Sequence, residues 1–338
     1  MRKFHGECAA SARLAIKGFT RDARSRNVRA PRHWTLLIVL HRLAHWAYDR
    51  AWLLMIATTM LWGGNGVASR LAVGRVTPMS LVFIRWLAVC VLLAIALRSQ
   101  LQAHRAELVA HRWRILLMAG FGFTGFTVLF YASAYYTTAV NITLLQSSIP
   151  PMVLAMSIVI VGVRPTLMQI VGMLVTLVGV SLIATHGEPL KIMQTQFNHG
   201  DILVLIACVF YAGYTFALRN RPPLPPLVFF AALAFAALVT SFPFMLGEVA
   251  TGHFHWPTPS GWLVLTFVAL GPSLASQLLY MRAVELIGPN RAGLFSNLVP
   301  IFGALFAVVI LGEEFHIYHA LALALTLAGI WLAEQRAR

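Results

Sequence analysis

Charged residues and cysteine are scarce in this sequence. Only 11% of its 338 residues are charged, whereas 59% are hydrophobic. A soluble domain usually carries about 25% charged residues, so the composition indicates a membrane protein. The three cysteines, Cys8, Cys90 and Cys208, have no paired spacing. We therefore expect neither a disulfide framework nor a zinc site.

Acidic residues are missing from the centres of the apolar segments. All 11 Asp and Glu residues lie in the N-terminal region, in predicted loops or near segment ends, and no histidine lies deep. Proton-coupled carriers commonly use membrane-embedded Asp, Glu or His, so no proton relay is expected at the membrane midplane. Facilitated diffusion, exchange and coupling through groups at segment ends all stay open.

Motifs of the common enzyme classes are also missing from the sequence. It contains no nucleophile elbow, no P-loop and no cluster of metal ligands. Gly120, Gly122 and Gly125 satisfy a G-x-G-x-x-G pattern, but they lie in an apolar segment, which favours helix packing over dinucleotide binding. We expect no catalytic residue, metal or cofactor, and the protein is not predicted to be an enzyme.

Long apolar windows dominate what is present. A window of about 20 residues spans a hydrocarbon core of about 30 Å as a helix. The sequence contains ten such windows, near residues 52–71, 78–97, 115–133, 140–161, 167–185, 202–218, 227–246, 261–281, 292–311 and 318–333.

Lys and Arg are distributed unevenly around these windows. With a cytoplasmic N-terminus, 22 of the 26 basic residues lie on the cytoplasmic side and three on the outer side. This positive-inside pattern predicts a multi-pass protein of the inner (plasma) membrane with both termini in the cytoplasm. The formal charge of +15 therefore reports topology, and nucleic acid is not an expected partner.

Residues 1–50 differ from the rest of the sequence because they are basic and contain no window long enough to span a membrane. We expect a poorly ordered cytoplasmic tail that is attracted to anionic lipid. An upstream start-site artefact is the alternative explanation for this region.

The apolar part of the sequence is duplicated. At an offset of 149 positions, Trp113 matches Trp262, and Tyr131 matches Tyr280. The repeats are predicted to cover residues 51–186 and 200–334, with five spans each. Because five is odd, the second repeat must cross the membrane in the opposite sense. The sequence therefore predicts an all-α membrane protein with ten transmembrane helices in a 5+5 inverted repeat.

Prolines interrupt the fourth and ninth windows at equivalent positions of the two repeats. Pro150, Pro151 and Pro300 each remove a backbone donor, and such paired breaks point to the central site of a transporter. We predict that they act as hinges. The polar residues just before them are candidates for the solute path, namely Gln146, Ser147, Ser148, Ser296 and Asn297. Alternatively, these side chains bond the carbonyls that the prolines leave free.

Arg85 is the one ionisable residue well inside a window, and Asn65 is predicted at a similar depth. A buried arginine either binds an anionic group of the solute or holds helix ends together, and both interpretations stay open. Gln277 and Tyr280 complete the predicted path, although aromatic residues at span ends are often interfacial anchors. The small residues Gly63, Gly64 and Gly213 are predicted to let helices approach closely.

Several short motifs resemble the EamA family of the drug/metabolite transporter superfamily. They are Leu61-Trp62-Gly63-Gly64-Asn65, Pro78 with Phe83-Ile84-Arg85-Trp86, Tyr136-Thr137-Thr138-Ala139, and the stretch from Ala283 through Asn290 and Pro300 to Leu311-Gly312-Glu313. The resemblance covers about 52–334 and implies a 5+5 carrier of small metabolites, often an exporter. One departure is that Gly312-Glu313 corresponds to Gly162-Val163 in the first repeat. Any role of a carboxylate there falls to Glu313 or Glu314.

These observations predict a secondary transporter that exports a small polar or zwitterionic, amino-acid-like solute by alternating access. The expected partners are the solute and the lipid bilayer, and a homodimer stays open. A non-transporting sensor or assembly subunit, or a membrane-embedded enzyme for lipid-linked substrates, are the alternatives.

Overall fold

The structure is a computed structural model, and it describes residues 48–188, 198–288, 292 and 295–334. All but three residues of the predicted basic tail lie outside the described residues, as do Gly293 and Leu294 before the second proline break. Every regular element in the described part of the chain is helical. The prediction of an all-helical protein is thus confirmed for these residues.

The first half of the sequence forms long helical segments joined by short turns. The elements are α3 (Ala51–Ala72), α4 (Pro78–Ala96), α5 (Arg98–Ala103), α6 (Arg105–Ala110), α7 (Arg112–Ala119), η1 (Gly120–Gly125), α8 (Phe126–Ser133), α9 (Ala139–Leu145), η2 (Gln146–Ser148), α10 (Ile149–Val161) and α11 (Leu167–Ala184). Local sequence sets several of these bounds. Pro78 occupies the first turn of α4, where a missing amide donor costs nothing, and Thr166 with Gln169 forms a capping box at α11.

The second half repeats this order. The elements are α12 (His199–Ala217), η4 (Leu218–Asn220), α13 (Pro226–Ala250), α14 (Pro259–Val268), η5 (Ala269–Ala275), α15 (Ser276–Ile287), η6 (Ser296–Leu298), α17 (Val299–Phe306), η7 (Ala307–Leu311) and α18 (Ile317–Glu334). Both α10 and η7 end at a glycine in the left-handed region, Gly162 at φ +71° and Gly312 at φ +67°. Glycine adopts this conformation without a steric penalty.

Six helical segments in the described part of the chain are long and apolar enough to cross a membrane. They are Pro78–Ala96, Arg112–Ser133, Ala139–Val161, His199–Asn220, Pro226–Ala250 and Pro259–Ile287. Leu167–Ile183, Ser296–Leu311 and Ile317–Ala333 are apolar but shorter. The 22-residue α3 is not among the six, because polar groups such as Asn65 and Arg70 lower its hydropathy. The prediction of a multi-pass helical protein is therefore confirmed, but the count of ten spans is not.

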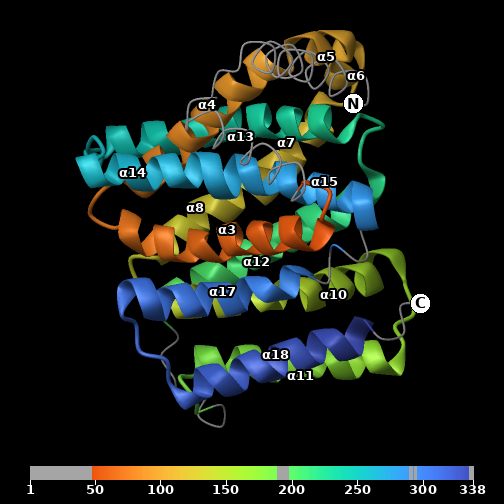
Figure 1. The fold of residues 1–338 in the computed structure, drawn as a ribbon, viewed down its shortest axis with the longest axis vertical. Helices are drawn as coiled ribbons and strands as arrows, with labels where there is room; N and C mark the ends of the chain where they lie inside the picture. Colours follow the sequence, from red (N-terminus) through yellow and green to blue (C-terminus); the bar gives the residue numbers. More distant parts are fainter. Residues whose placement is uncertain (1–47, 189–197, 289–291, 293–294, 335–338) are drawn as a thin grey trace, which may run out of the picture. The chain divides into compact units, whose positions relative to one another are not determined.

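Helices from the two halves pack against each other. Helix α11 pairs with α18, α4 with α13, α3 with α15 and α17, and α12 with α8 and α10, and Figure 1 shows α11 and α18 lying side by side. Glycines permit the α11–α18 approach. A Cβ added at Gly179 would lie 2.8 Å from Cγ2 of Thr326. Such close crossings are typical of helices that associate in lipid.

Two of the three π-helical segments in the described part of the chain interrupt long helices at equivalent positions. The segment η1 lies between α7 and α8, and η5 lies between α14 and α15. A π turn leaves a carbonyl without its usual donor. In η5, which contains Pro272, the Ser273 hydroxyl donates to the Val268 carbonyl at 2.6 Å. In η1, the Thr124 hydroxyl reaches across to the Ala237 carbonyl of α13 at 3.1 Å.

Candidate functional site

Arg85 lies at the centre of a buried polar group that joins three helices. Its side chain is 5% exposed, and Nη1 donates to the Tyr131 hydroxyl of α8 at 3.1 Å. The Tyr131 hydroxyl in turn donates to Oδ1 of Asn65 on α3 at 2.6 Å. The structure thus brings the predicted residues Asn65 and Arg85 together through Tyr131.

The Arg85 guanidinium has aromatic neighbours and no acidic partner. Its Cζ lies 4.9 Å from the centroid of Trp86 and 5.6 Å from that of Tyr131. Within the described residues it forms no ion pair, and its Nε has no hydrogen-bond partner. Cation–π contacts stabilise a desolvated guanidinium only in part. Among the described residues no carboxylate neutralises this positive charge, which suits the binding of an anionic group.

The first proline break has the predicted position and a defined geometry. Gln146, Ser147 and Ser148 form a 3₁₀ turn, and Pro150 and Pro151 then occupy the first turn of α10. The Gln146 side-chain amide donates to the Ile142 carbonyl one turn earlier at 3.1 Å. The Oγ atoms of the buried Ser147 and Ser148 make no hydrogen bond in the described part of the chain.

The second proline break has the same form. Ser296 and Asn297 belong to the 3₁₀ turn η6, and Pro300 is in the first turn of α17. Both polar residues are half-buried. Gln277 is also half-buried on α15, and the ring of Tyr280 packs against Trp62 with centroids 5.5 Å apart. Within the described residues, no hydrogen bond or ring contact joins Gln277 or Tyr280 to Arg85 or its partners Tyr131 and Asn65.

A cavity of about 660 Å³ lies between α3, α14 and the α17–η7 segment. It is lined by apolar residues, among them Leu61, Gly64, Phe267, Phe306 and Ile310. None of the predicted path residues lines it. This cavity therefore differs in character from a polar solute path, and we do not assign the solute to it.

The three glycines predicted to pack helices behave differently. A Cβ at Gly63 would lie 2.7 Å from the backbone nitrogen of Gly303, and one at Gly64 would lie 3.3 Å from Cζ of Phe267. By contrast, no heavy atom lies within 4 Å of a Cβ at Gly213. The prediction of close packing at Gly213 is wrong, because no neighbouring helix approaches that face of α12.

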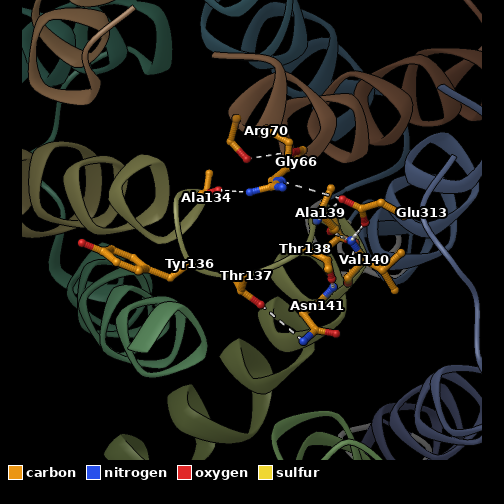
Figure 2. Close-up of polar contacts among 12 residues, drawn as sticks. Gly66, Arg70, Ala134, Tyr136, Thr137, Thr138, Ala139, Val140, Asn141 and Glu313 are labelled. Atoms are coloured by element: carbon orange, nitrogen blue, oxygen red, sulfur yellow. Dashed lines mark hydrogen bonds and ion pairs between the residues drawn. The ribbon is translucent and has the colours of Figure 1, made fainter. Parts of the chain in front are cut away.

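Glu313 caps the N-terminus of α9 from the other half of the chain. Its Oε1 accepts from the amide of Ala139 and its Oε2 from that of Val140, both at 2.9 Å. Arg70 lies 3.9 Å from the same carboxylate and also donates to the Ala134 carbonyl, as Figure 2 shows. A carboxylate is favourable here because the N-terminus of a helix carries a partial positive charge.

Glu248 caps the N-terminus of α4 in the same way. Its carboxylate accepts from the hydroxyls of Thr77 at 2.5 Å and Ser80 at 2.7 Å, and from the amides of Ser80 at 3.0 Å and Met79 at 3.1 Å. Partial burial raises the pKa of nearby Tyr135, and the negative charge of Glu248 adds to this effect. The N-terminal ends of α4 and α9, which bind Glu248 and Glu313, together form what we call the capped end.

A third acidic residue, Asp201 on α12, also lies at the capped end. Its Oδ1 accepts from the Thr137 hydroxyl at 2.6 Å, and both of its oxygens lie 3.4 Å from the amide nitrogen of Asn141. Oδ1 of Asn141 lies 3.2 Å from Nε2 of His319 on α18. Thr137 and Asn141 are seen in Figure 2 beside the start of α9. Asn141 thus links one helix of the first half to two of the second.

Comparison with known proteins decides the family. The model of the EamA-like transporter family matches residues 50–185 and again residues 198–334. The chain belongs to the EamA-like transporter family. The prediction made from the sequence motifs is confirmed.

Relatives of this EamA-like transporter are similar along most of their length. The uncharacterized transporter YyaM of Bacillus subtilis is 22% identical over 83% of this chain and 92% of the relative. The uncharacterized inner membrane transporter YicL of Salmonella typhimurium is 26% identical over 82% and 93%. A solved structure described only as the crystal structure of a protein aligns with a TM-score of 0.58, 19% identity, and coverage of 84% and 96%. This EamA-like protein therefore has the fold of that structure and is a multi-pass membrane transporter.

Sequence reasoning missed several residues of this EamA-like transporter. It set Glu248, Asp201 and the histidines aside as groups at segment ends, yet the exposed fractions are 8% for Glu248, 1% for Asp201 and 3% for His319. Their position along a helix does not show burial, because the cover comes from the other half of the chain. The available signal was that each lies within one turn of an apolar helix end.

Proposed function

We propose that this protein is a secondary transporter that exports a small polar or zwitterionic, amino-acid-like solute by alternating access. In this proposal it has ten spans in a 5+5 inverted repeat, with repeats at residues 51–186 and 200–334. It lies in the inner membrane with both termini in the cytoplasm, as the distribution of basic residues favours.

The pairing of helices is the observation that carries the proposal. An offset of 149 or 150 residues converts α3 into α12, α8 into α15 and α10 into α17. The contacts of α3 with α15 and α17 thereby become those of α12 with α8 and α10. Helix α4 pairs with its own equivalent α13, and α11 with α18. A contact pattern that survives exchange of the halves supports an inverted repeat about a pseudo-twofold axis.

The solute class follows from the groups that the helices enclose. Arg85 offers a positive charge beside Tyr131 and Asn65, which suits a carboxylate. The 3₁₀ turns before Pro150 and Pro300 offer hydroxyl and amide groups. A strongly cationic solute would lack a counter-charge here, because within the described residues no carboxylate contacts Arg85.

Alternating access follows from the unequal ends of the helices. With both termini in the cytoplasm, the capped end faces outward. Glu248 and Glu313 of the second half hold helices α4 and α9 of the first half there. Rocking of one half against the other about Pro150, Pro151 and Pro300 would have to break these contacts. In this proposal, these contacts belong to a conformation that is closed at the outer end.

Counterflow in liposomes tests this function. Purified protein is reconstituted, loaded with an unlabelled mixture of amino acids, and supplied with labelled amino acids, sugars or amphiphilic cations outside. We expect accumulation of labelled amino acids and none in protein-free liposomes. Absence of movement for every solute, together with retention of a bound protein partner, would instead favour a sensor or assembly subunit.

A further inference from the structure

Asp201 is a buried carboxylate at the start of α12. It is 1% exposed and lies in the first turn of α12, and its described partners, Thr137 and Asn141, are neutral donors. Within the described residues it forms no ion pair. A carboxylate in such surroundings is sensitive to protonation, because burial penalises its charged form.

The hydrogen bonds around Asn141 have a fixed direction while Asp201 is ionised. A carboxylate only accepts, so the amide NH₂ of Asn141 must face Asp201. The amide oxygen therefore faces Nε2 of His319, which must carry a proton to donate across 3.2 Å. Nδ1 of His319 accepts from the amide of His316 at 3.1 Å. The network thus requires a neutral His319 in one tautomer.

We propose that Asp201 and His319, bridged by Asn141, form a proton-binding site that couples solute movement to a pH gradient. The inference rests on the transport proposed above. Its ligand is a proton from the aqueous phase at the capped end, and its effect is to weaken the hydrogen bonds that hold α12 and α18 against α9, because Asp201 loses its charge.

Binding of one proton reverses the network. The proton adds to Oδ2 of Asp201, and the resulting O–H needs an acceptor, which Asn141 provides only if its amide turns over. The NH₂ group then faces His319, so Nε2 must lose its proton to water while Nδ1 gains one. The new Nδ1–H then faces the backbone N–H of His316. Because both groups are donors, the hydrogen bond between His316 and His319 is lost. Overall Asp201 binds one proton, and the change of tautomer leaves His319 neutral.

Other titratable groups surround the pair. His316 and Tyr318 flank His319, Glu314 lies 3.3 Å from His316, and the His186 ring lies 6.3 Å from Tyr318. His199 shares the first turn of α12 with Asp201. Positive charge on His186 or His316 disfavours a second positive charge on His319, because like charges repel. A positive charge on His186 also favours ionised Asp201, but burial of the carboxylate is the larger effect, so Asp201 is the residue that takes the proton.

Thiol labelling tests the site without knowledge of the solute. In a chain whose three native cysteines are replaced by alanine, Ser69→Cys places a thiol at a position on α3 that is 1% exposed. Tyr136→Cys, at a position that is 60% exposed, provides a reference for the pH dependence of the reagent. Both are labelled in proteoliposomes with a membrane-impermeant maleimide at pH 7.5 and 5.5.

We expect the ratio of Ser69→Cys to Tyr136→Cys labelling to rise severalfold at pH 5.5. Addition of Asp201→Asn or His319→Gln should abolish the rise, whereas Glu285→Gln, at an exposed carboxylate, should leave it unchanged. A rise that persists with Asp201→Asn, or no rise in the parent, overturns the proposal.

Flux measurements separate failure of coupling from failure of transport. With labelled amino acids as the probe, wild type and Glu285→Gln should exchange label and accumulate it when a pH gradient is imposed, whereas Asp201→Asn should show no accumulation in response to the gradient. Exchange by wild type without any response to the gradient refutes proton coupling and leaves the transport function standing. If wild type moves nothing while labelling remains pH-dependent, the transport function fails and the proton site stands.

Discussion

Removal of the Glu248 side chain should destabilise the protein strongly. Glu248 is 8% exposed and accepts four hydrogen bonds from the N-terminal turn of α4. In Glu248→Ala the amides of Met79 and Ser80 lose their acceptor in a place that water reaches poorly. In Glu248→Gln one oxygen stays available, but the charge is lost.

The magnitude follows from the kind of hydrogen bond. A hydrogen bond to a charged group contributes about 1.5–3 kcal/mol net, and bonds to one carboxylate do not add fully. We expect Glu248→Ala to lower the free energy of unfolding by about 4 kcal/mol and Glu248→Gln by about 2 kcal/mol. At about 2–4 °C per kcal/mol, Glu248→Ala should lower the apparent melting temperature by roughly 10 °C.

Tryptophan fluorescence during heating in a mild detergent measures this change. Glu285→Ala is the matched control, because Glu285 is exposed and pairs with Arg282 at 3.3 Å on the same helix, and such pairs contribute at most about 1 kcal/mol. The reasoning is refuted if Glu248→Ala melts within about 2 °C of wild type, or if Glu285→Ala loses as much.

Three further predictions follow from the structure. Gly63→Ala should lower stability by about 2 kcal/mol, because its Cβ would meet the Gly303 backbone, whereas Gly213→Ala, with open space, should be neutral or gain up to about 1 kcal/mol; equal melting temperatures would contradict this. Pro151→Ala and Pro300→Ala should slow flux in liposomes more than they lower expression, and unchanged flux in both would count against a hinge. Arg85→Gln should lose most flux at equal membrane amount, since no carboxylate in the described part of the chain pairs with the guanidinium and its Nε has no hydrogen-bond partner, and normal flux would remove Arg85 from the solute path.

Much of the helical framework follows from local sequence. The predicted windows 78–97 and 167–185 correspond closely to α4 (Pro78–Ala96) and α11 (Leu167–Ala184). Apolar length and capping residues set these bounds, and both are local properties. The turn at Gln146–Ser148 was predictable for the same reason, because proline removes a donor at a known position.

The π segments were not predicted. The glycines of Gly120–Gly125 suggested close packing, and Gly122 does lie against the Tyr214 side chain of α12. An extra residue in a helical turn, however, depends on partners such as Thr240, whose hydroxyl lies 2.6 Å from that of Thr124. These partners lie more than 100 residues away along the sequence. Local propensity carries no information about them.

The candidate site shows the same limit. Asn65 and Arg85 were expected at similar depth, but Tyr131, which joins them, was only one of several aromatic residues that could face the path. Asp201, Asn141 and His319 come from three separate segments, and only tertiary packing brings Asn141 within 3.4 Å of Asp201 and 3.2 Å of His319. A single sequence gives their chemistry and leaves their pairing undetermined.

The difference between Glu313 and Val163 bears on which conformation of the protein is favoured. Both follow a glycine that ends a helix in the same conformation, and the amide of each bonds the carbonyl six residues earlier at 3.3 Å. In the proposed inverted repeat, two identical halves would give the inward- and outward-facing conformations equal free energy. Only the residues that differ between the halves could then favour one conformation. Glu313 is such a residue, and in this proposal its carboxylate favours the conformation in which it caps α9.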